Sequence, residues 1–281
     1  MTADRRALTR RGVLSLLGAA GLAAACAAGS GVLPRRVACA SGAEELHAAL
    51  LLGVRPVAAA LGPGDPVVAR LRVPVDRIAR WPAGARDLTV LADARPDLVL
   101  HVERVDGTDP AALRAAAPEA PVVPVAPSTP VDEQLRMVGR LVGRAAQAEQ
   151  AVAGHAYRAG LVAEVVAASP LARAAVALAV PSPDGAPRLL GPLTPGGAAL
   201  RAAGAGRVLD DDRDLPDADV VLRVSAGPAT TPVAVGTDPR WGVTGHTVAV
   251  RREEFLMDSA LVRLARLIEI ERVAHLLSGP R

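Results

Sequence analysis

Short runs of apolar residues alternate along this chain with longer stretches in which apolar residues recur at helical spacing. We predict strands at residues 37–40, 57–61, 98–102 and 122–125 in the first half of the chain, and at 175–180, 220–224 and 247–250 in the second. Strands that alternate with helices in this way form mainly parallel sheets covered by helices. The pattern therefore predicts an α/β fold.

Capping signals mark where several of the intervening helices begin. Ser41, followed three residues later by Glu44, is a capping-box pattern that predicts a helix through residue 52. A cap residue followed by proline predicts three further starts, at Asp109-Pro110, Thr129-Pro130 and Thr194-Pro195. Helices are also expected at 88–94 and 258–277, whereas residues 65–86, which are rich in Pro and Arg, are expected to be irregular.

One long helical stretch divides the pattern into two halves. Residues 145–168 have helical composition without a firm breaker, apart from Gly154 and Gly160, and the strand–helix alternation restarts after them. We therefore predict an N-terminal α/β lobe at 37–144, an interdomain helix at 145–168 and a C-terminal α/β lobe at 169–281.

The first 26 residues have the pattern of an export signal. Four arginines, Arg5, Arg6, Arg10 and Arg11, precede an apolar run over 12–25, and that run is shorter than the roughly 20 residues that a membrane span needs. Thr9-Arg10-Arg11 and the three residues after it resemble the twin-arginine export motif, with Val13 in place of the usual Phe.

Residues 22–26, Leu-Ala-Ala-Ala-Cys, resemble a lipobox, in which the cysteine is diacylated and becomes the mature N-terminus. The usual Leu lies one position further back here, at Leu22. The prediction is a lipid on Cys26, an extracytoplasmic protein anchored to the cell membrane, and a short tether over 27–36. The alternative is a plain signal peptide cleaved after Ala-x-Ala.

Composition narrows the classes of function. The chain has 281 residues, of which 51% are hydrophobic and 22% charged, so it can form sizeable cores and is not disordered. All 32 basic residues are arginine, the net charge is only +3 and aromatic residues make up 1%, a balance that disfavours nucleic-acid binding. Two cysteines are too few for a disulfide framework, and Cys39 is expected to be a buried, inert thiol.

Ligands of open α/β sheets bind outside the carboxyl ends of the strands, so the loops that follow the strands supply the candidate ligand-binding residues. These are Ser41, Arg80, Trp81, Arg104, Arg223 and Trp241. The two tryptophans, one in each lobe, could clamp a ring system, or each could fill a core beneath its loop. The three arginines could contact an anionic chelate, or each could be a solvated surface residue.

Enzymatic and metal-binding signals are weak. The sequence has no GxSxG elbow, P-loop or HExxH motif, and we identify no nucleophile–base pair that would make it a hydrolase. The five histidines are scattered, and His101, which ends a predicted strand, is expected to be a satisfied core histidine. The acidic run at 210–212 with Asp214 could bind a hard cation but is more typical of a solvated loop. We expect a protein that is not an enzyme and needs no catalytic residue, cofactor or metal.

Several stretches together resemble the class III periplasmic binding proteins, which deliver iron–siderophores, haem and cobalamin to ABC importers. Residues 91–100, LADARPDLVL, resemble the family's "laLkPDLVl" signature, and residues 120–123 resemble its "aPvv" strand. Residues 135–148 resemble its "lG..lGr...A" pattern, and residues 196–205 resemble its second-lobe helix. The resemblance implies two lobes that face each other across a cleft, one rigid connecting helix, and a small-molecule metal chelate bound between the lobes for delivery to an ABC permease.

The chain departs from the family where its members present a surface glutamate on each lobe to the importer. Thr89 occupies that position in the first lobe, and Ala198 or Ala199 occupies it in the second. Asp87 and Glu119 could substitute for these glutamates from nearby. The alternative function is therefore a lipoprotein of the same fold that acts as a sensor or interaction module uncoupled from transport.

Overall fold

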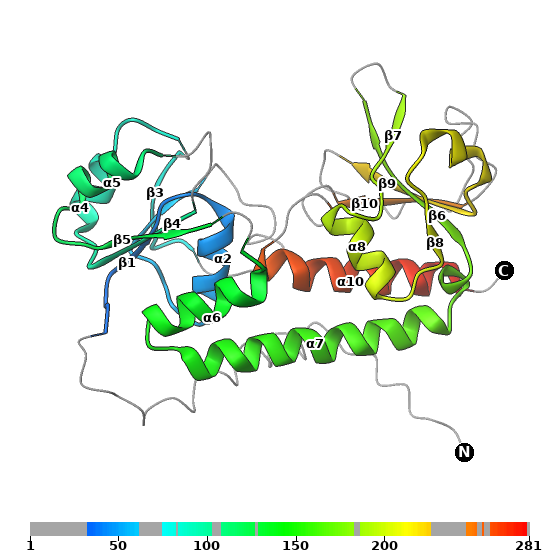
Figure 1. The fold of residues 1–281 in the computed structure, drawn as a ribbon, viewed down its shortest axis with the longest axis horizontal. Helices are drawn as coiled ribbons and strands as arrows, with labels where there is room; N and C mark the ends of the chain where they lie inside the picture. The colour runs from blue at the N-terminus through cyan, green and yellow to red at the C-terminus, as the bar shows by residue number, and fades with distance from the viewer. Residues whose placement is uncertain are drawn as a thin grey trace. The chain divides into compact units, whose positions relative to one another are not determined.

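The computed structural model describes residues 33–61, 75–82, 84–102, 108–126, 129–182, 186–225, 246–251, 255 and 259–279. The chain divides into two compact units, unit 1 over Met1–Ala153 and unit 2 over Gly154–Arg281. The division lies within the long helix α7 (Ala145–Ala167), which runs unbroken through Gly154 and Gly160 and carries the chain from one unit to the other (Figure 1). The predicted lobe boundaries at 144 and 169 stay predictions.

Unit 1 contains a five-stranded sheet, called sheet A below, in the order β3-β2-β1-β4-β5 with every neighbouring pair parallel. Its strands are β1 (Val37–Cys39), β2 (Ala58–Ala60), β3 (Ala79–Trp81), β4 (Leu98–Val102) and β5 (Val122–Val125). β1, β2 and β4 are buried along their whole length, as expected of a parallel sheet with both faces covered. β5 carries Pro124, which has no N–H to donate and is tolerated because β5 lies at the edge of the sheet.

Four helices follow strands of this sheet: α2 (Ala43–Leu51), α4 (Thr89–Ala94), α5 (Pro110–Ala116) and α6 (Val131–Leu141). Each helix begins after the end of a strand. Because the strands are parallel, the helices begin at the carboxyl edge of sheet A and end at its amino edge. The core between α4, α5 and the sheet combines small alanines of β1 and β2 with Trp81, Leu91 and Leu113.

Unit 2 has its own sheet, sheet B, in the order β10-β9-β6-β7, with β8 also paired to β6. Its strands are β6 (Ala175–Pro181), β7 (Pro187–Leu189), β8 (Arg207–Val208), β9 (Val220–Ser225) and β10 (His246–Arg251). All pairs are parallel except β6 with β7. Its helices are α8 (Pro195–Ala202), α10 (Ala260–Leu277) and the short 3-10 turns η1 (Pro170–Ala172) and η2 (Asp212–Asp217).

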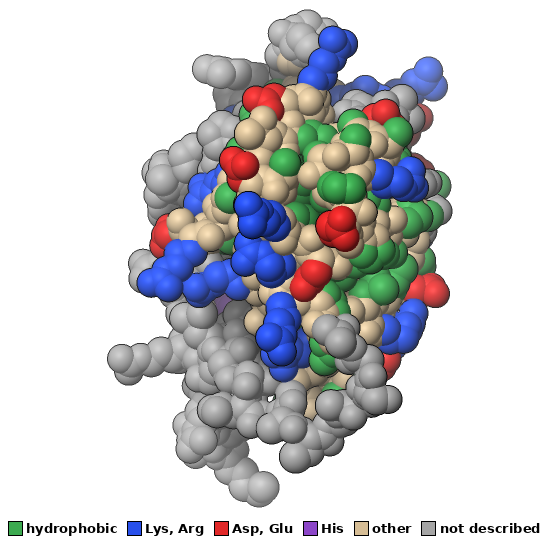
Figure 2. All heavy atoms as spheres, turned by 90° about the vertical axis from the view of Figure 1, so that its left-hand side faces the viewer, with side chains coloured by type: hydrophobic (Ala, Val, Ile, Leu, Met, Phe, Trp, Pro, Cys, Tyr) green, Lys and Arg blue, Asp and Glu red, His purple; other side chains and the backbone are tan. Residues whose placement is uncertain are grey.

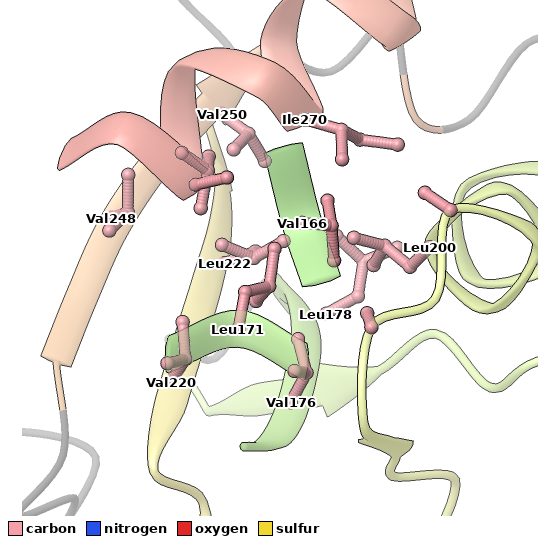
Figure 3. Packing of buried hydrophobic residues seen from close by; sticks show 14 of the residues in the cluster. Val166, Leu171, Val176, Leu178, Leu200, Val220, Leu222, Val248, Val250 and Ile270 are labelled. Atoms are coloured by element: carbon pink, nitrogen blue, oxygen red, sulfur yellow. The ribbon is translucent and has the colours of Figure 1, made fainter. Parts of the chain in front are cut away.

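The main core of unit 2 lies between sheet B and its helices. Figure 3 shows Leu178 and Leu222 of the sheet pointing toward Leu200 of α8, Ile270 of α10 and Val166 of α7. An ion pair between Arg158 of α7 and Glu271 of α10 joins the two helices that cover this core.

Most of the predicted elements are confirmed. The seven predicted strands are present, and β4 and β5 have the predicted bounds. The irregular assignment of 65–86 is wrong at 79–81, where β3 pairs in parallel with β2, and the short strands β7 and β8 were not predicted. The helix predicted at 258–277 begins instead at Ala260, with Ser259 as its N-cap.

Two of the predicted caps are wrong. Gly42, not Ser41, is the N-cap of α2, and Pro130, not Thr129, is the N-cap of α6, and neither cap position makes a side-chain hydrogen bond. The caps at Asp109 and Thr194 are confirmed, because their side chains accept hydrogen bonds from the N–H groups of Ala111 and Gly197. Within the part of the chain that the structure describes, no helix combines the length and the apolar character that crossing a membrane requires.

Candidate functional site

The order of strands in sheet A places β1 beside β4, and this is where the direction of the strand order reverses. The chain moves outward from β1 to β2 and β3 on one side, and from β4 to β5 on the other. In open α/β sheets, the carboxyl ends of the two strands at this point flank the usual ligand crevice. The candidate site is therefore the carboxyl edge of sheet A where β1 and β4 end.

Ser41 and His101 meet at this position. The Ser41 Oγ lies 2.7 Å from the His101 Nδ1 and accepts a hydrogen bond of 2.8 Å from the N–H of Val102. Gly42 makes this possible, because its φ of 121° turns the chain into α2 through a conformation that other residues rarely adopt. The Ser41 hydroxyl therefore faces β4 rather than capping the helix.

A buried carboxyl group completes the arrangement. The side chain of Glu45, in the first turn of α2, accepts a hydrogen bond from the backbone N–H of Ser41. Burial raises the pKa of Glu45 to about 8, although the hydrogen bonds from backbone N–H groups oppose the shift. Glu45 is thus mostly protonated at neutral pH, and its second oxygen has no hydrogen-bond partner among the described residues.

Cys39, the last residue of β1, adjoins this cluster. Its thiol is free and buried, and burial, followed by the neighbouring Glu45, raises its pKa well above the ordinary value. A thiol held protonated is a poor nucleophile and a poor metal ligand, which agrees with the inert role expected for it.

The Ser41–His101 pair has the spacing of a nucleophile and its base, a pairing that the sequence analysis did not identify. Only 8% of Ser41 and 2% of His101 is exposed, and the Ser41 Oγ also holds the end of β4. A nucleophile has to reach its substrate, so this geometry favours a structural link across the edge over acyl transfer.

Trp81 and Arg80 occupy the end of β3, the edge strand on the far side of β2. Trp81 is 2% exposed and packs in the core with Leu88 and Leu91, which is the core-filling arrangement named above as the alternative to a ligand clamp. Its indole Nε1 has no hydrogen-bond partner among the described residues. Arg80 is exposed and donates to the carbonyl of Val75 at 3.2 Å.

The other candidate residues lie in unit 2 or outside the described residues. Arg223 lies within β9 of unit 2 and is half-buried. Arg104, Trp241 and the lipidation candidate Cys26 fall outside the described residues.

Carboxylates of the acidic run in unit 2 accept hydrogen bonds from nearby backbone N–H groups. The Asp211 carboxylate accepts from the N–H of Arg213 as the N-cap of η2, and the Asp212 carboxylate accepts from the N–H of Leu189 in β7. Across the described ranges, no group of three or more His, Cys, Asp or Glu side chains is arranged to hold a metal ion.

Comparison with known proteins agrees with this architecture. Residues 86–220 match the family model described as "Periplasmic binding protein". A periplasmic solute-binding protein from Mycobacterium smegmatis has a similar structure, with 18% identity, a TM-score of 0.67, and coverage of 88% of this chain and 93% of that one. The fold is that of a periplasmic binding protein.

Of two further structures of similar fold, one contains a bound ligand and the other is of a transporter component. FhuD2 from Staphylococcus aureus, solved with bound ferrioxamine B, has 18% identity and a TM-score of 0.64, covering 88% of this chain and all of that one. A FhuD-fold component of a ferrichrome ABC transporter from Bacillus subtilis has 15% identity and a TM-score of 0.65, covering 88% and 95%. No curated protein sequence matches this chain.

These comparisons confirm the predicted resemblance to the class III periplasmic binding proteins and the predicted two-part α/β fold. Proteins of this family are extracytoplasmic binding proteins rather than enzymes. The sequence had already singled out Ser41 and His101 separately. That the two side chains meet could not be read from it, because the adjacency of β1 and β4 depends on the strand order.

The positions at which the chain departs from the pattern of the family that it resembles are both on the surface. Thr89 is the first residue of α4, and its N–H and hydroxyl both donate to the Asp87 carboxylate, at 3.0 and 2.6 Å. These two hydrogen bonds lower the pKa of Asp87. Ala198 is exposed on α8 and offers no charge.

Proposed function

We propose that this chain is the extracytoplasmic solute-binding lipoprotein of an ABC importer and that it binds an iron–siderophore-like or cobalamin-like chelate without transforming it. The observation that carries the proposal is the strand-order reversal at β1 and β4, whose carboxyl ends form the usual ligand position in a fold that matches the periplasmic binding proteins. The ligand class is supported by the ferrioxamine B and ferrichrome named for structures of similar fold.

The chelate would lie against the carboxyl edge of sheet A. Arg80 and Arg104 would pair with carboxylate or catecholate oxygens, and Ser41 would shape the edge between the two strands. Trp81, being buried, would form the apolar floor of this region rather than an exposed stacking face. Arg223 and Trp241 are the residues that unit 2 would contribute.

Titration of the domain that begins after Cys26 tests this function. Tryptophan fluorescence and calorimetry would be followed with ferrioxamine B, haem and cobalamin, and at least one should bind saturably. Because Trp81 lies in the core, Trp81→Phe is the appropriate variant, since an alanine would leave a destabilising cavity. A folded domain that binds none of the three chelates in calorimetry would contradict the proposal.

Membrane anchoring would come from a diacylated Cys26. Cys26→Ser should move the protein from the membrane fraction to the medium or the soluble fraction, and the wild-type N-terminus should carry the mass of a lipid. An unmodified mature chain cleaved before Cys26 would favour the plain signal peptide instead.

Docking to the permease would use Asp87. Its lowered pKa keeps the exposed carboxylate charged, and Thr89 fixes its direction at the start of α4, close to where the family presents a glutamate. Asp87→Asn should weaken transport while leaving chelate affinity unchanged, whereas Glu119→Gln should change neither.

The second candidate function is a sensor or interaction module of the same fold that feeds no importer. Thr89 and Ala198, neither of which carries a charge, motivate it. A chain that binds a chelate while its gene has no neighbouring permease and ATPase, and while its deletion leaves uptake unchanged, would favour this alternative.

A further inference from the structure

The amino edge of sheet A, where its strands begin, carries a repeated charge pattern. An arginine precedes four of the five strands by one to three residues: Arg36 before β1, Arg55 before β2, Arg77 before β3 and Arg95 before β4. All four side chains belong to exposed residues. Because the strands are parallel, these four positions lie along one edge of unit 1.

Helix ends and loops add further arginines to the same edge. Arg114 and Arg140 lie in the last turns of α5 and α6, Arg144 lies in the turn between α6 and α7, and Arg35 precedes Arg36. The carboxylates at this edge are Asp76, Asp93, Asp97 and Glu119, so eight arginines face four acids. Figure 2 looks onto this end of unit 1 and shows a band of arginine side chains, with acidic side chains beside it.

The opposite edge of sheet A has the opposite charge. The charged acids that the structure describes near the helix starts are Glu44, Asp87, Asp109, Asp132 and Glu133, and Arg86 lies among them before α4. Basic residues near helix ends offset the helix dipole, which accounts for Arg114 and Arg140. It does not account for Arg55 and Arg77, which lie in the loops before strands.

Unit 2 shows that the fold alone does not require this pattern. The described charges at the amino edge of sheet B are Arg173, Arg201 and Arg207 together with Glu164, Asp217 and Asp219, which balance. The excess of arginine is therefore a property of one edge of one unit.

The N-terminal part of the chain is fastened to this same edge. The N–H groups of Arg35 and Arg36 donate to the Asp97 carboxylate at 2.8 and 2.9 Å, and the Arg36 guanidinium donates to the carbonyls of Ala94 and Arg95. Leu33 lies against the turn at Gly143, where an added Cβ would come within 2.5 Å of its side chain. Cys26 is seven residues before Leu33, so even a fully extended connection spans at most about 25 Å.

We propose that the amino edge of sheet A is a membrane-facing surface that binds anionic lipid headgroups. That this edge faces a membrane rests on the lipid anchor of the proposed function. The charge pattern of the edge is independent of that function. An arginine within a Debye length of an anionic bilayer strengthens binding to that bilayer by about fivefold. Three such arginines together strengthen it by about a hundredfold.

Vesicle binding of the lipid-free domain, residues 27–281, tests this surface. The domain should sediment with vesicles of phosphatidylcholine and phosphatidylglycerol in equal parts, should not sediment with pure phosphatidylcholine, and should be released by added salt. No binding to the anionic vesicles, or equal binding to both kinds, would overturn the proposal.

A pair of matched triple variants separates this edge from net charge. Arg55→Glu, Arg77→Glu and Arg140→Glu together should weaken vesicle binding by about tenfold or more, whereas Arg173→Glu, Arg201→Glu and Arg207→Glu together should change it by less than about twofold. Equal losses in the two variants would contradict a specific surface. So would equally tight, arginine-dependent binding of heparin, because the edge would then recognise polyanions in general.

Chelate titration of the same variants keeps the two proposals apart. The unit 1 variant alters the edge opposite the candidate ligand site, so it should bind any chelate as the wild type does and should retain its circular dichroism. If the domain binds chelate but not anionic vesicles, only the membrane surface is overturned. If it binds anionic vesicles but no chelate, only the proposed ligand is overturned.

Discussion

Glu45 links the carboxyl edge of sheet A to pH more directly than any other described carboxyl group, because it is fully buried and bonded to the loop after β1. Its pKa is about 8 in the folded protein, against an ordinary value of 4.5. The folded state therefore holds a proton that the unfolded chain releases between these two values. The stabilisation from protonated Glu45 is complete below about pH 4.5 and is lost as the pH rises toward 8.

Glu45→Gln should remove this dependence, since glutamine keeps an oxygen that can accept from Ser41 and has no proton to lose. The wild type should lose stability between pH 5 and pH 8 with a slope of up to about 1.4 kcal/mol per pH unit relative to the variant. Urea unfolding at several pH values measures the difference, with Glu119→Gln, a change at an exposed turn position, as the control, which should behave as the wild type. Parallel stability curves for wild type and Glu45→Gln would show that the carboxyl is not protonated on folding.

Ser41→Ala addresses the link between the two strands. The change removes the acceptor for the buried N–H of Val102 and the partner of the His101 Nδ1, which should cost about 1–3 kcal/mol of unfolding free energy. Ser278→Ala, at an exposed position after α10, should cost no more than about 0.5 kcal/mol. A loss at Ser41 no larger than at Ser278 would contradict the proposed bridging role.

At the scale of single elements, α6 and α8 differ in whether the threonine at the helix start contributes to stability. A Thr-Pro pair lies at the start of each helix, yet only Thr194 makes the capping bond, at 3.2 Å to the N–H of Gly197. Thr194→Ala should therefore destabilise the protein by about 1 kcal/mol, whereas Thr129→Ala should change stability by less than about 0.5 kcal/mol. Thermal and urea unfolding of the two variants measure this, and equal effects would mean that the caps are equivalent.

The elements that the sequence predicted best are those whose signal is local. β4 is a five-residue run, apolar except for His101, that follows Pro96-Asp97, and its bounds were predicted without error. β3 is only three residues long, includes the exposed Arg80 and takes its structure from pairing with β2, so no local pattern marks it. Ser41 was wrongly predicted as a cap for the same reason. Its hydroxyl hydrogen-bonds to His101 of β4, which is 60 residues away in the sequence.

At the scale of the whole molecule, the described residues give each unit a core of its own. The core of unit 1 contains Trp81 and Leu91, and the main core of unit 2 is built around Leu178, Leu200 and Leu222. Composition alone indicated enough apolar residues for two cores. The sheet orders, and with them the candidate site, follow from long-range pairing that no single stretch of the sequence encodes.

Each unit contains one tryptophan, Trp81 in unit 1 and Trp241 in unit 2, so the stability of each can be followed alone. In Trp241→Phe protein the fluorescence reports unit 1, and in Trp81→Phe protein it reports unit 2. Leu200 is fully buried in unit 2, and Leu200→Ala should destabilise that unit by about 2–5 kcal/mol. Because each unit has a core of its own, the Trp241 transition should move to lower urea while the Trp81 transition stays within about 0.5 kcal/mol. If both transitions move together, the units unfold as one cooperative body, and a change in either core would then be felt at the carboxyl edge of sheet A.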